Sequence, residues 1–439
     1  MCKGIIYLLK TSFLSQKYTT FVPIMCEHTI TMNRYIRNII VCIFILCPAI
    51  AMAQMDSLLF EDNHMLDSTA QGELRLNIDG LSFFRDNEYE GNLTKGYTLP
   101  GFWLQPTISF QPLKNLRLEA GIYMMHYWGA NKYPNLNYSD IPTWKGDQTQ
   151  SGFHILPFFS VHLALSERLN LVLGNLYGRN NHHLVEPLYN QETGLSADPE
   201  AGLQLLWDTR AMNLDTWINW ESFIFNNDKH QESFTFGLAT RFKANRPQAF
   251  THVYFPIQVL MQHRGGEINP DAESREVKTW MNAAAGLGLT FHPHSNVLTQ
   301  INIESTVLYY KQSAGQMLPF DKGHGFYTKA DVDLGHFRLH GAFWSAHNFI
   351  TIFGNPLFGS IGINQEDYTM PDPKMISARI SYGRDLGHGF SWGIHGDVYN
   401  NLSADAHSDE KGWYKEKSKF SVAAGIYLRF NPTYLLKRF

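Results

Sequence analysis

The feature that most constrains this chain is an alternation of apolar and polar residues with a period of two. The segment 420–430 shows it best. One set of alternate positions holds Phe420, Val422, Ala424, Ile426, Leu428 and Phe430, and the other set holds Ser421, Ala423, Gly425, Tyr427 and Arg429. Successive side chains of a β-strand point to opposite faces, so the pattern predicts a strand with one wholly apolar face. That face must be covered by protein or by lipid.

The alternation recurs along the chain and predicts about sixteen strands, within a range of roughly 14–18. They are expected at residues 72–84, 101–111, 115–127, 152–165, 168–178, 200–208, 213–225, 232–243, 250–263, 278–292, 296–311, 324–334, 336–346, 374–384, 389–400 and 417–430. Short connections such as 112–114 alternate with mostly long ones such as 128–151. This order predicts an antiparallel meander with its short turns and both termini on one side.

A conventional export signal precedes the strands. Residues 1–31 are interpreted as an upstream start-site extension, and 32–53 as a signal peptide. Arg34 and Arg37 form its positive region, and an apolar run at 39–47 is too short to cross a bilayer as a helix. Small residues place the expected cleavage between Ala53 and Gln54, so that 54–71 becomes a polar periplasmic lead-in and 72–439 one domain. All four cysteines lie before the cleavage position, which excludes disulfides and thiolate metal sites from the remainder.

Two all-β architectures are compatible with alternation: an exported soluble sandwich and a transmembrane barrel. The unbroken meander and the sorting of loop lengths favour the barrel. The aromatic content of 14% suits barrel strands and interface girdles, while the mean hydropathy of −0.24 does not oppose a membrane location because barrel strands are only half apolar. The chain therefore resembles a Gram-negative outer-membrane β-barrel of porin size, without the signature of a particular family. The resemblance implies contact with outer-membrane lipid and insertion by the barrel-assembly machinery.

If the apolar positions face lipid, the alternate positions face the lumen. The charged residues then expected along the lumen are Glu73, Arg75, Asp79, Arg117, Glu119, Arg241, Glu304, Lys329, Asp331, Asp333, Arg338, Arg379, Asp397 and Arg429. Both signs occur, which suits a water-filled channel and equally a lumen closed by ion pairs. Small residues from Asn282 to Gly288 mark an inward face that a loop or solute could approach closely.

The long connection 347–373 is unusually apolar. Its apolar positions include Phe349, Phe353, Pro356, Phe358 and Ile361. Exposed to solvent, these residues would form a sticky patch. Three arrangements would cover these apolar residues. The loop folds inward as a constriction, packs across its neighbouring loops as a lid, or binds an outer partner.

Chemistry is not predicted. Ser391, His395 and Asp397 share a strand face, but a serine four residues from its histidine lies about 13 Å away, too far for direct proton transfer. The histidine pairs 182–183 and 292/294 lack a defined ligand geometry. We therefore expect no catalytic residue, metal or cofactor.

The leading functional hypothesis is a porin-like channel for small polar solutes. The alternatives are a non-conducting structural or interaction barrel, serving surface attachment, secretion or envelope assembly, and, third, an outer-membrane hydrolase. The net charge of −4 argues against a nucleic-acid partner. A homo-oligomer is compatible with this size, although no interface is indicated.

Overall fold

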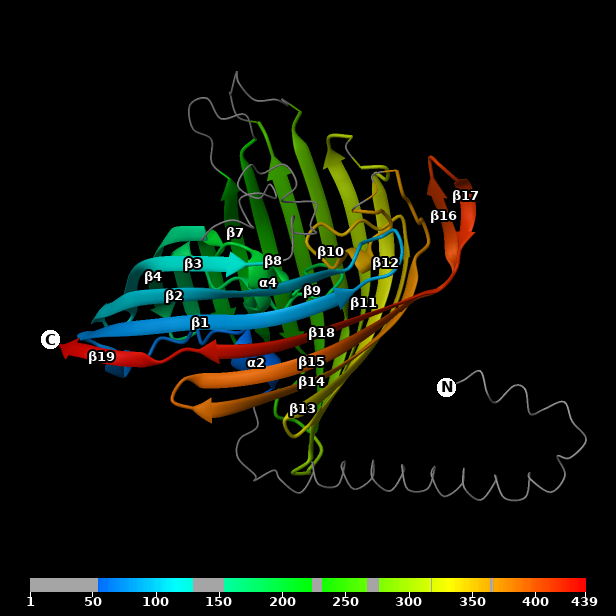
Figure 1. Cartoon of the computed structure of the whole chain (residues 1–439). Coiled ribbons are helices and arrows are strands. Elements are labelled where there is room, and N and C mark those ends of the chain that lie inside the picture. Colours follow the sequence, from blue (N-terminus) through cyan, green and yellow to red (C-terminus); the bar gives the residue numbers. More distant parts are fainter. Residues whose placement is uncertain are drawn as a thin grey trace, which may run out of the picture. The chain divides into compact units, whose positions relative to one another are not determined.

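The wall of the molecule is a closed antiparallel barrel of sixteen strands, as the alternation predicts. The computed structural model describes residues 54–128, 154–222, 231–266, 276–316, 318–363, 365 and 367–439. The wall strands are β1 (Glu73–Glu88), β2 (Tyr97–Leu113), β3 (Leu116–Tyr127), β4 (His154–Ser166), β5 (Leu169–Asn175), β6 (Ala201–Asp208), β7 (Met212–Ser222), β8 (Ser233–Lys243), β9 (Thr251–Arg264), β10 (Lys278–Phe291), β11 (Leu298–Ala314), β12 (Lys322–Leu334), β13 (Phe337–His347), β14 (Lys374–Gly387), β15 (Phe390–Asn401) and β18 (Lys419–Phe430). Figure 1 shows them side by side in chain order.

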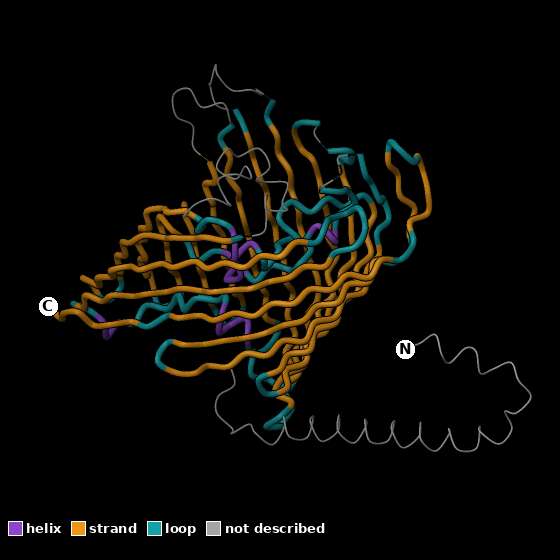
Figure 2. Tube along the Cα trace, viewed as in Figure 1, coloured by secondary structure: helices purple, strands orange, loops and turns teal. Residues whose placement is uncertain are grey.

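Smaller elements complete the described chain. They are α2 (Met55–Leu59), η2 (Ser68–Ala70), η5 (Arg179–His182), α4 (Thr193–Ser196), η6 (Pro356–Phe358), the hairpin β16 (Ala404–Ser408) and β17 (Gly412–Glu416), and β19 (Thr433–Arg438). The elements α2, α4, η5 and η6 lie within the outline of the strands, whereas η2 lies at the end of the wall near the C-terminus (Figure 2). In the part of the chain described here, no helix is long and apolar enough to span a bilayer.

The first and last strands close the barrel. β1 pairs with β2 on one side and with β18 on the other, from Gly80↔Phe430 to Glu88↔Val422. The chain then continues past Phe430 as β19, which pairs with the beginning of β1. The residues after Phe430, which follow the last expected strand, thus extend the closure of the wall.

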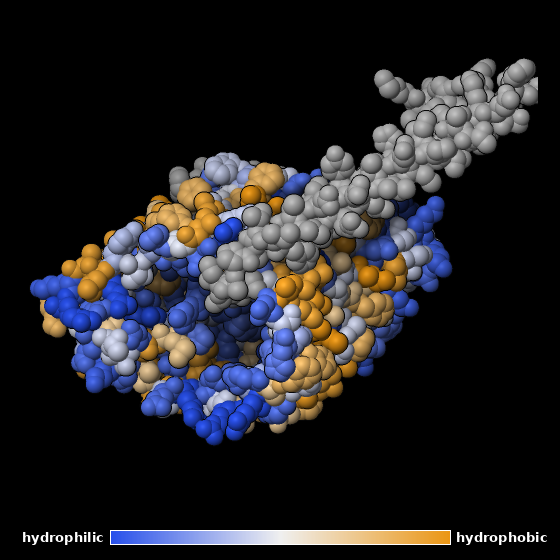
Figure 3. Space-filling view, turned by 90° about the horizontal axis from the view of Figure 1, so that it is seen from below, coloured by the Kyte–Doolittle hydropathy of each residue, from blue (hydrophilic) through white to orange (hydrophobic). Residues whose placement is uncertain are grey.

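The two faces of the wall have opposite character. On β18, Phe420 and Ile426 are 58% and 51% exposed, whereas Tyr427 and Arg429 are 2% and 4% exposed. Figure 3 shows hydrophobic residues gathered on the outer surface beside a hollow lined mainly by hydrophilic ones. A barrel with an apolar exterior and a polar interior is the arrangement that lipid requires.

The helix α2 occupies the inner side of β14, β15 and β18. The helix packs against two glycines, Gly383 and Gly393, which lie directly opposite each other in adjacent strands. A Cβ at either position would meet Met55. The absence of side chains there lets the segment before β1, expected as a periplasmic lead-in, pack within the wall.

Two connections on the long-loop side fold back into the barrel. The segment 176–200 and the segment 347–373 contact each other through Asn190, whose N–H donates to Phe353 O (2.8 Å), and Thr351, whose hydroxyl donates to Pro187 O (2.6 Å). Asn282 on β10 anchors the second segment: its Nδ2 donates to Ile350 O (2.9 Å), and its Oδ1 accepts from Ile352 N (2.8 Å). The close approach expected at this small-residue face is confirmed at Asn282.

Glycines on the inner wall make room for the large aromatic side chains, which gives a first prediction. A Cβ at Gly237 would overlap the Trp217 indole, whereas a Cβ at Gly341, which lies on the outward face of β13, meets nothing within 4 Å. We expect Gly237→Ala to lower the free energy of unfolding by about 1–3 kcal/mol through overpacking. The measurement is urea unfolding of the detergent-folded barrel, with Gly341→Ala as the matched control. Equal midpoints for the two variants would contradict this packing argument.

Candidate functional site

The most concentrated polar group inside the barrel is held between the wall and the inward segment 176–200. We call it the Arg85 cluster. It consists of Arg85 and Asn87 from β1, Arg379 from β14, His395 and Asp397 from β15, and Glu186 and Glu192 from the inward segment. Five of the seven are buried, with Asn87, Glu192 and Asp397 between 1% and 3% exposed, while Arg379 and Glu186 are half-buried.

The carboxylate of Glu192 is the contact between the segment and β1. Its Oε2 forms an ion pair with Arg85 Nε (2.6 Å) and accepts from Asn87 Nδ2 (2.9 Å), while Arg85 Nε donates to Asn87 Oδ1 (2.9 Å). Its second oxygen accepts from the Tyr97 hydroxyl. A buried carboxylate with three donors is well satisfied, whereas removing one partner would leave a charge in a low dielectric.

The imidazole of His395 lies at the centre of the cluster. Its Nε2 is 2.7 Å from Arg85 Nη1 and 3.3 Å from Asp397 Oδ2. Arg379 pairs with Asp397 on one side and with Glu186 (3.0 Å) on the other. With two guanidinium groups and three carboxylates, the cluster carries one net negative charge while His395 is neutral.

A cavity of about 30 Å³ adjoins these groups, lined among others by Arg85, Arg379, Glu192 and His395. This volume is enough for one or two water molecules, and polar partners of both kinds surround it. The cavity therefore places space for water beside a histidine, carboxylates and two strong donors.

The cluster lies toward the long-loop end of the wall. Arg85 and Asn87 are close to the end of β1 at Glu88, and on the outer face of the same level Phe84 and Val422 are exposed. If the long loops face outward, as in outer-membrane barrels, this is the depth of the outer leaflet. In that orientation, the Arg85 cluster would lie level with the region where acyl chains meet headgroups.

A second buried group fixes the other end of segment 176–200. His182 stacks on Trp217, with ring centroids 3.4 Å apart and an interplanar angle of 5°. Its Nδ1 is 2.7 Å from Asp215 Oδ2, and its Nε2 is 3.0 Å from Glu200 Oε2. Burial alone lowers the pKa of His182, but the charges of Glu200 and Asp215 outweigh burial and raise the pKa to about 9. His182 is therefore a charged clamp with both nitrogens engaged, not a free base.

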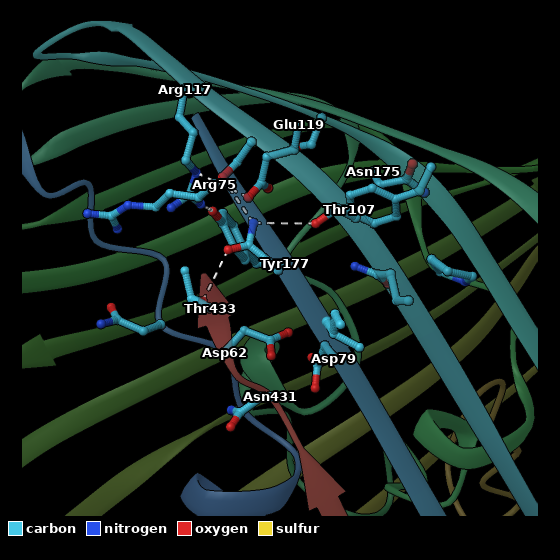
Figure 4. Close-up of a pocket in the computed structure, with 18 of the residues that line it drawn as sticks. Asp62, Arg75, Asp79, Thr107, Arg117, Glu119, Asn175, Tyr177, Asn431 and Thr433 are labelled. Carbon is cyan, nitrogen blue, oxygen red and sulfur yellow. Dashed lines mark hydrogen bonds and ion pairs between the residues drawn. The ribbon is translucent and has the colours of Figure 1, made fainter. Parts of the chain in front are cut away.

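The half of the lumen nearer the short turns holds two larger polar cavities, of about 420 and 460 Å³. In Figure 4, side chains from β1, β2, β3 and the segment after β18 converge on the first of them. Arg429 crosses this region, pairing with Asp79 (2.8 Å) and with Asp62 of the lead-in. Charges of both signs line the cavities, and many of them pair with one another.

The structure places the charged residues expected in the lumen as follows. Glu73, Arg75, Asp79, Arg117, Glu119 and Arg429 line the first cavity, and Arg241, Lys329, Asp331, Arg338 and Arg379 line the second. Glu304 is 4.0 Å from Lys329, Asp333 is 2.7 Å from Arg338, and Asp397 belongs to the Arg85 cluster. A role in conducting solutes stays a prediction.

The apolar connection 347–373 is buried inside the barrel. Phe349 and Phe358 are fully buried and pack edge-to-face against Trp344 of the wall, with centroids 5.2 and 5.6 Å apart. Phe353, Pro356 and Ile361 are buried as well. A role of this segment in narrowing a solute path stays a prediction.

The sequence-based expectations missed half of the Arg85 cluster for a definite reason. The first strand was expected to end at residue 84, so Arg85 and Asn87 fell into a loop although they continue the inward parity of β1. Glu192 lies in a connection without periodicity, and no local signal marks it.

The structure separates the three residues that share a face of the expected strand 389–400. His395 and Asp397 meet at 3.3 Å, while Ser391 lies farther along β15, opposite Arg429. Within the described residues, no group of three or more histidine, cysteine or acidic side chains forms a metal site.

Comparison of the sequence with known protein families gives a match that covers most of the chain. Residues 66–439 match the lipid A 3'-O-deacylase-type family. Among curated protein sequences, no match to the chain is found.

Solved structures with a similar fold are outer-membrane proteins. OpdK from Pseudomonas aeruginosa has a TM-score of 0.43 and 10% identity, covering 83% of this chain and 100% of its own. OccAB2 from Acinetobacter baumannii has a TM-score of 0.44 and 11% identity, covering 82% and 98%. OmpT from Vibrio cholerae has a TM-score of 0.43 and 6% identity, covering 82% and 99%.

The closed wall of sixteen strands, apolar outside and polar inside, gives the protein the fold of an outer-membrane β-barrel. Because the family match spans most of the sequence, the chain belongs to the lipid A 3'-O-deacylase-type family. The expectation that it is not an enzyme is wrong, since the family is named for an enzyme activity. The expectation rested on the distance between a serine and its base on one strand, whereas the polar groups of the Arg85 cluster come from three strands and an inward loop.

The His182 clamp predicts a pH dependence of stability. Its pKa in the folded protein, about 9, lies above the ordinary value of 6.5. The clamp's contribution is therefore fully present below pH 6.5 and is lost as the pH rises through 9. We expect His182→Gln to destabilise the barrel strongly at pH 6 and much less at pH 10, by urea unfolding or by proteolysis of segment 176–200. A deficit that does not change with pH would show that His182 is not charged in the folded protein.

Proposed function

We propose that this protein is an outer-membrane esterase of the lipid A 3'-O-deacylase type, which hydrolyses an ester-linked acyl chain of a glycolipid in the outer leaflet. The observation that carries the proposal is the family match over residues 66–439. The Arg85 cluster supports it independently, because it combines a water-sized cavity, a histidine beside a carboxylate, and two guanidinium groups at the depth of the outer leaflet.

The cluster supplies the parts that ester hydrolysis needs. His395 takes a proton from a water in the cavity as that water attacks the ester carbonyl carbon, and Asp397 stabilises the imidazolium that forms. Arg85 and Arg379 are donors for the oxyanion of the tetrahedral intermediate. When the bond between the carbonyl carbon and the sugar oxygen breaks, the imidazolium returns the proton to that oxygen, which leaves a free fatty acid and a sugar hydroxyl.

The resting arrangement implies a movement before catalysis. Arg85 Nη1 faces His395 Nε2 at 2.7 Å, and Glu192 holds Arg85 and Asn87 from the lumen side. Entry of an ester therefore requires the segment around Glu192 to move away from β1. Arg85 then turns from the imidazole to the ester oxygen, which frees Nε2 to accept the proton.

The first test is the lipid A of a Gram-negative host expressing the protein. Mass spectrometry of extracted lipid A should show a species lacking one ester-linked acyl chain. His395→Gln and Asp397→Asn should each lower the deacylated fraction by at least about a hundredfold, the usual effect of removing a general base or its partner. Glu119→Gln, in the cavity near the short turns, is the matched control and should retain activity.

Heat-resistant migration in gels checks that each variant is folded. Full-length lipid A in cells producing folded wild-type protein would overturn the proposal. Deacylation unaffected by His395→Gln would remove the Arg85 cluster from the mechanism.

Passage of small polar solutes is the second candidate function. The two cavities of about 420 and 460 Å³, lined by both signs of charge, favour it. The buried segments 176–200 and 347–373 oppose free passage, because they fill the lumen near the long loops.

Planar-bilayer conductance distinguishes an open from a filled lumen. We expect the wild-type protein to be silent and deletion of residues 350–362 to produce stable steps, because the deletion removes the buried segment that Asn282 anchors. Shortening the hairpin β16–β17 is the control and should leave the barrel silent. Porin-like steps from the wild type would support solute passage, and an inserted, silent deletion variant would refute the constriction.

A further inference from the structure

The outer wall changes character abruptly at the long-loop end of β11–β14. The apolar band on these neighbouring strands ends at Tyr309, Phe326, Phe343 and Ile376, which are 39%, 43%, 36% and 51% exposed on the lipid-facing side. Aromatic side chains at the edge of an apolar band mark the level where acyl chains give way to headgroups.

Immediately beyond this edge, outward positions carry cationic side chains. Lys311 follows Tyr309 on β11, Lys322 lies beyond Phe326 on β12, and Lys374 precedes Ile376 on β14, and all three are exposed. We call these three lysines the rim patch. His324 and His347 lie between them as exposed cross-strand partners, with ring centroids 5.5 Å apart.

The rim patch contains an unfavourable pair. Lys311 and Lys322 are directly opposite in the register of β11 and β12. Like charges in this position destabilise a sheet, and a bound anion would relieve the repulsion.

Two nearby carboxylates have hydrogen-bond partners other than these lysines. Asp372 accepts from His347 Nδ1 (2.7 Å), and the Oδ1 of Asp321 accepts from the inward Gln312. Within the described ranges, none of the three lysines forms a salt bridge. The corresponding outward positions of β1 are acidic instead, namely Asp86 and Glu88, so the lysine pattern is not repeated on that strand.

We propose that the rim patch is a docking surface for a phosphate-bearing lipid of the outer leaflet, whose acyl chains lie along the exposed residues of β11–β14 and whose phosphate lies between the lysines. Charge and position identify this occupant: only an amphiphile places an anion directly above an apolar band. The surface is separate from the Arg85 cluster, so the inference does not depend on hydrolysis.

The test measures lipid retention by native mass spectrometry of the purified protein in neutral detergent. The probes are lipid A with two phosphates and the same lipid after dephosphorylation. We expect the wild type to retain the phosphorylated lipid at least tenfold better. The triple variant Lys311→Gln/Lys322→Gln/Lys374→Gln should reduce that retention by more than tenfold, since each lysine near an anionic headgroup contributes about fivefold. The matched control is Lys114→Gln/Lys415→Gln/Lys417→Gln, which removes three exposed lysines elsewhere.

Each outcome decides between occupants. Equal retention by wild type and the triple variant would overturn the proposal, as would equal loss in both triple variants or equal retention of the dephosphorylated lipid. Displacement by 50 mM inorganic phosphate alone would show that a free anion, not a lipid, is recognised. If the triple variant does not refold to a heat-resistant barrel, the three single variants replace it, each with an expected loss of about fivefold. Cellular deacylation is scored separately, so the two proposals can fail independently.

Discussion

The pairing of β1 with β18 is the constraint on which the rest of the structure depends. Surrounded by lipid, a sheet edge would leave a row of backbone donors and acceptors without partners, at several kcal/mol for each group. Closure with β2 on one side of β1 and β18 on the other removes that edge. Closing the ring at sixteen strands also fixes a lumen wider than wall side chains alone would fill.

The inward segments fill part of this lumen, and they do so with two kinds of contact. Segment 347–373 packs Phe349 and Phe358 against Trp344, so apolar burial holds it. Segment 176–200 is held by charge, through Glu192 at one end and the His182 clamp at the other. Buried ion pairs contribute little net stability but are costly to disrupt singly, so they specify where a segment docks. The same contacts bring Glu192 to β1 and so assemble the Arg85 cluster.

The wall was predictable from the sequence because lipid enforces a period of two on every strand. All sixteen strands lie where the alternation places them, and their charged inward positions follow from parity. The interior was not predictable, since its contacts join residues with no sequence relation, as in Asn282 with Ile350 or Arg85 with Glu192. A longer first strand would have put Arg85 and Asn87 on the inner wall. No periodicity could have predicted that Glu192 would return to meet them.

The distribution of charge in the described barrel follows the solvent that each surface meets. Inside, guanidinium groups and carboxylates alternate and largely pair, because a lumen filled by protein offers little water to solvate a lone charge. On the outer rim, Lys311 and Lys322 face each other without a carboxylate between them, an arrangement favourable only if the surrounding medium supplies the anion. An outer leaflet rich in phosphate is such a medium. Together, the two proposals would have the wall act on one class of lipid at two places, with headgroups at the rim of β11–β14 and acyl esters beside β1.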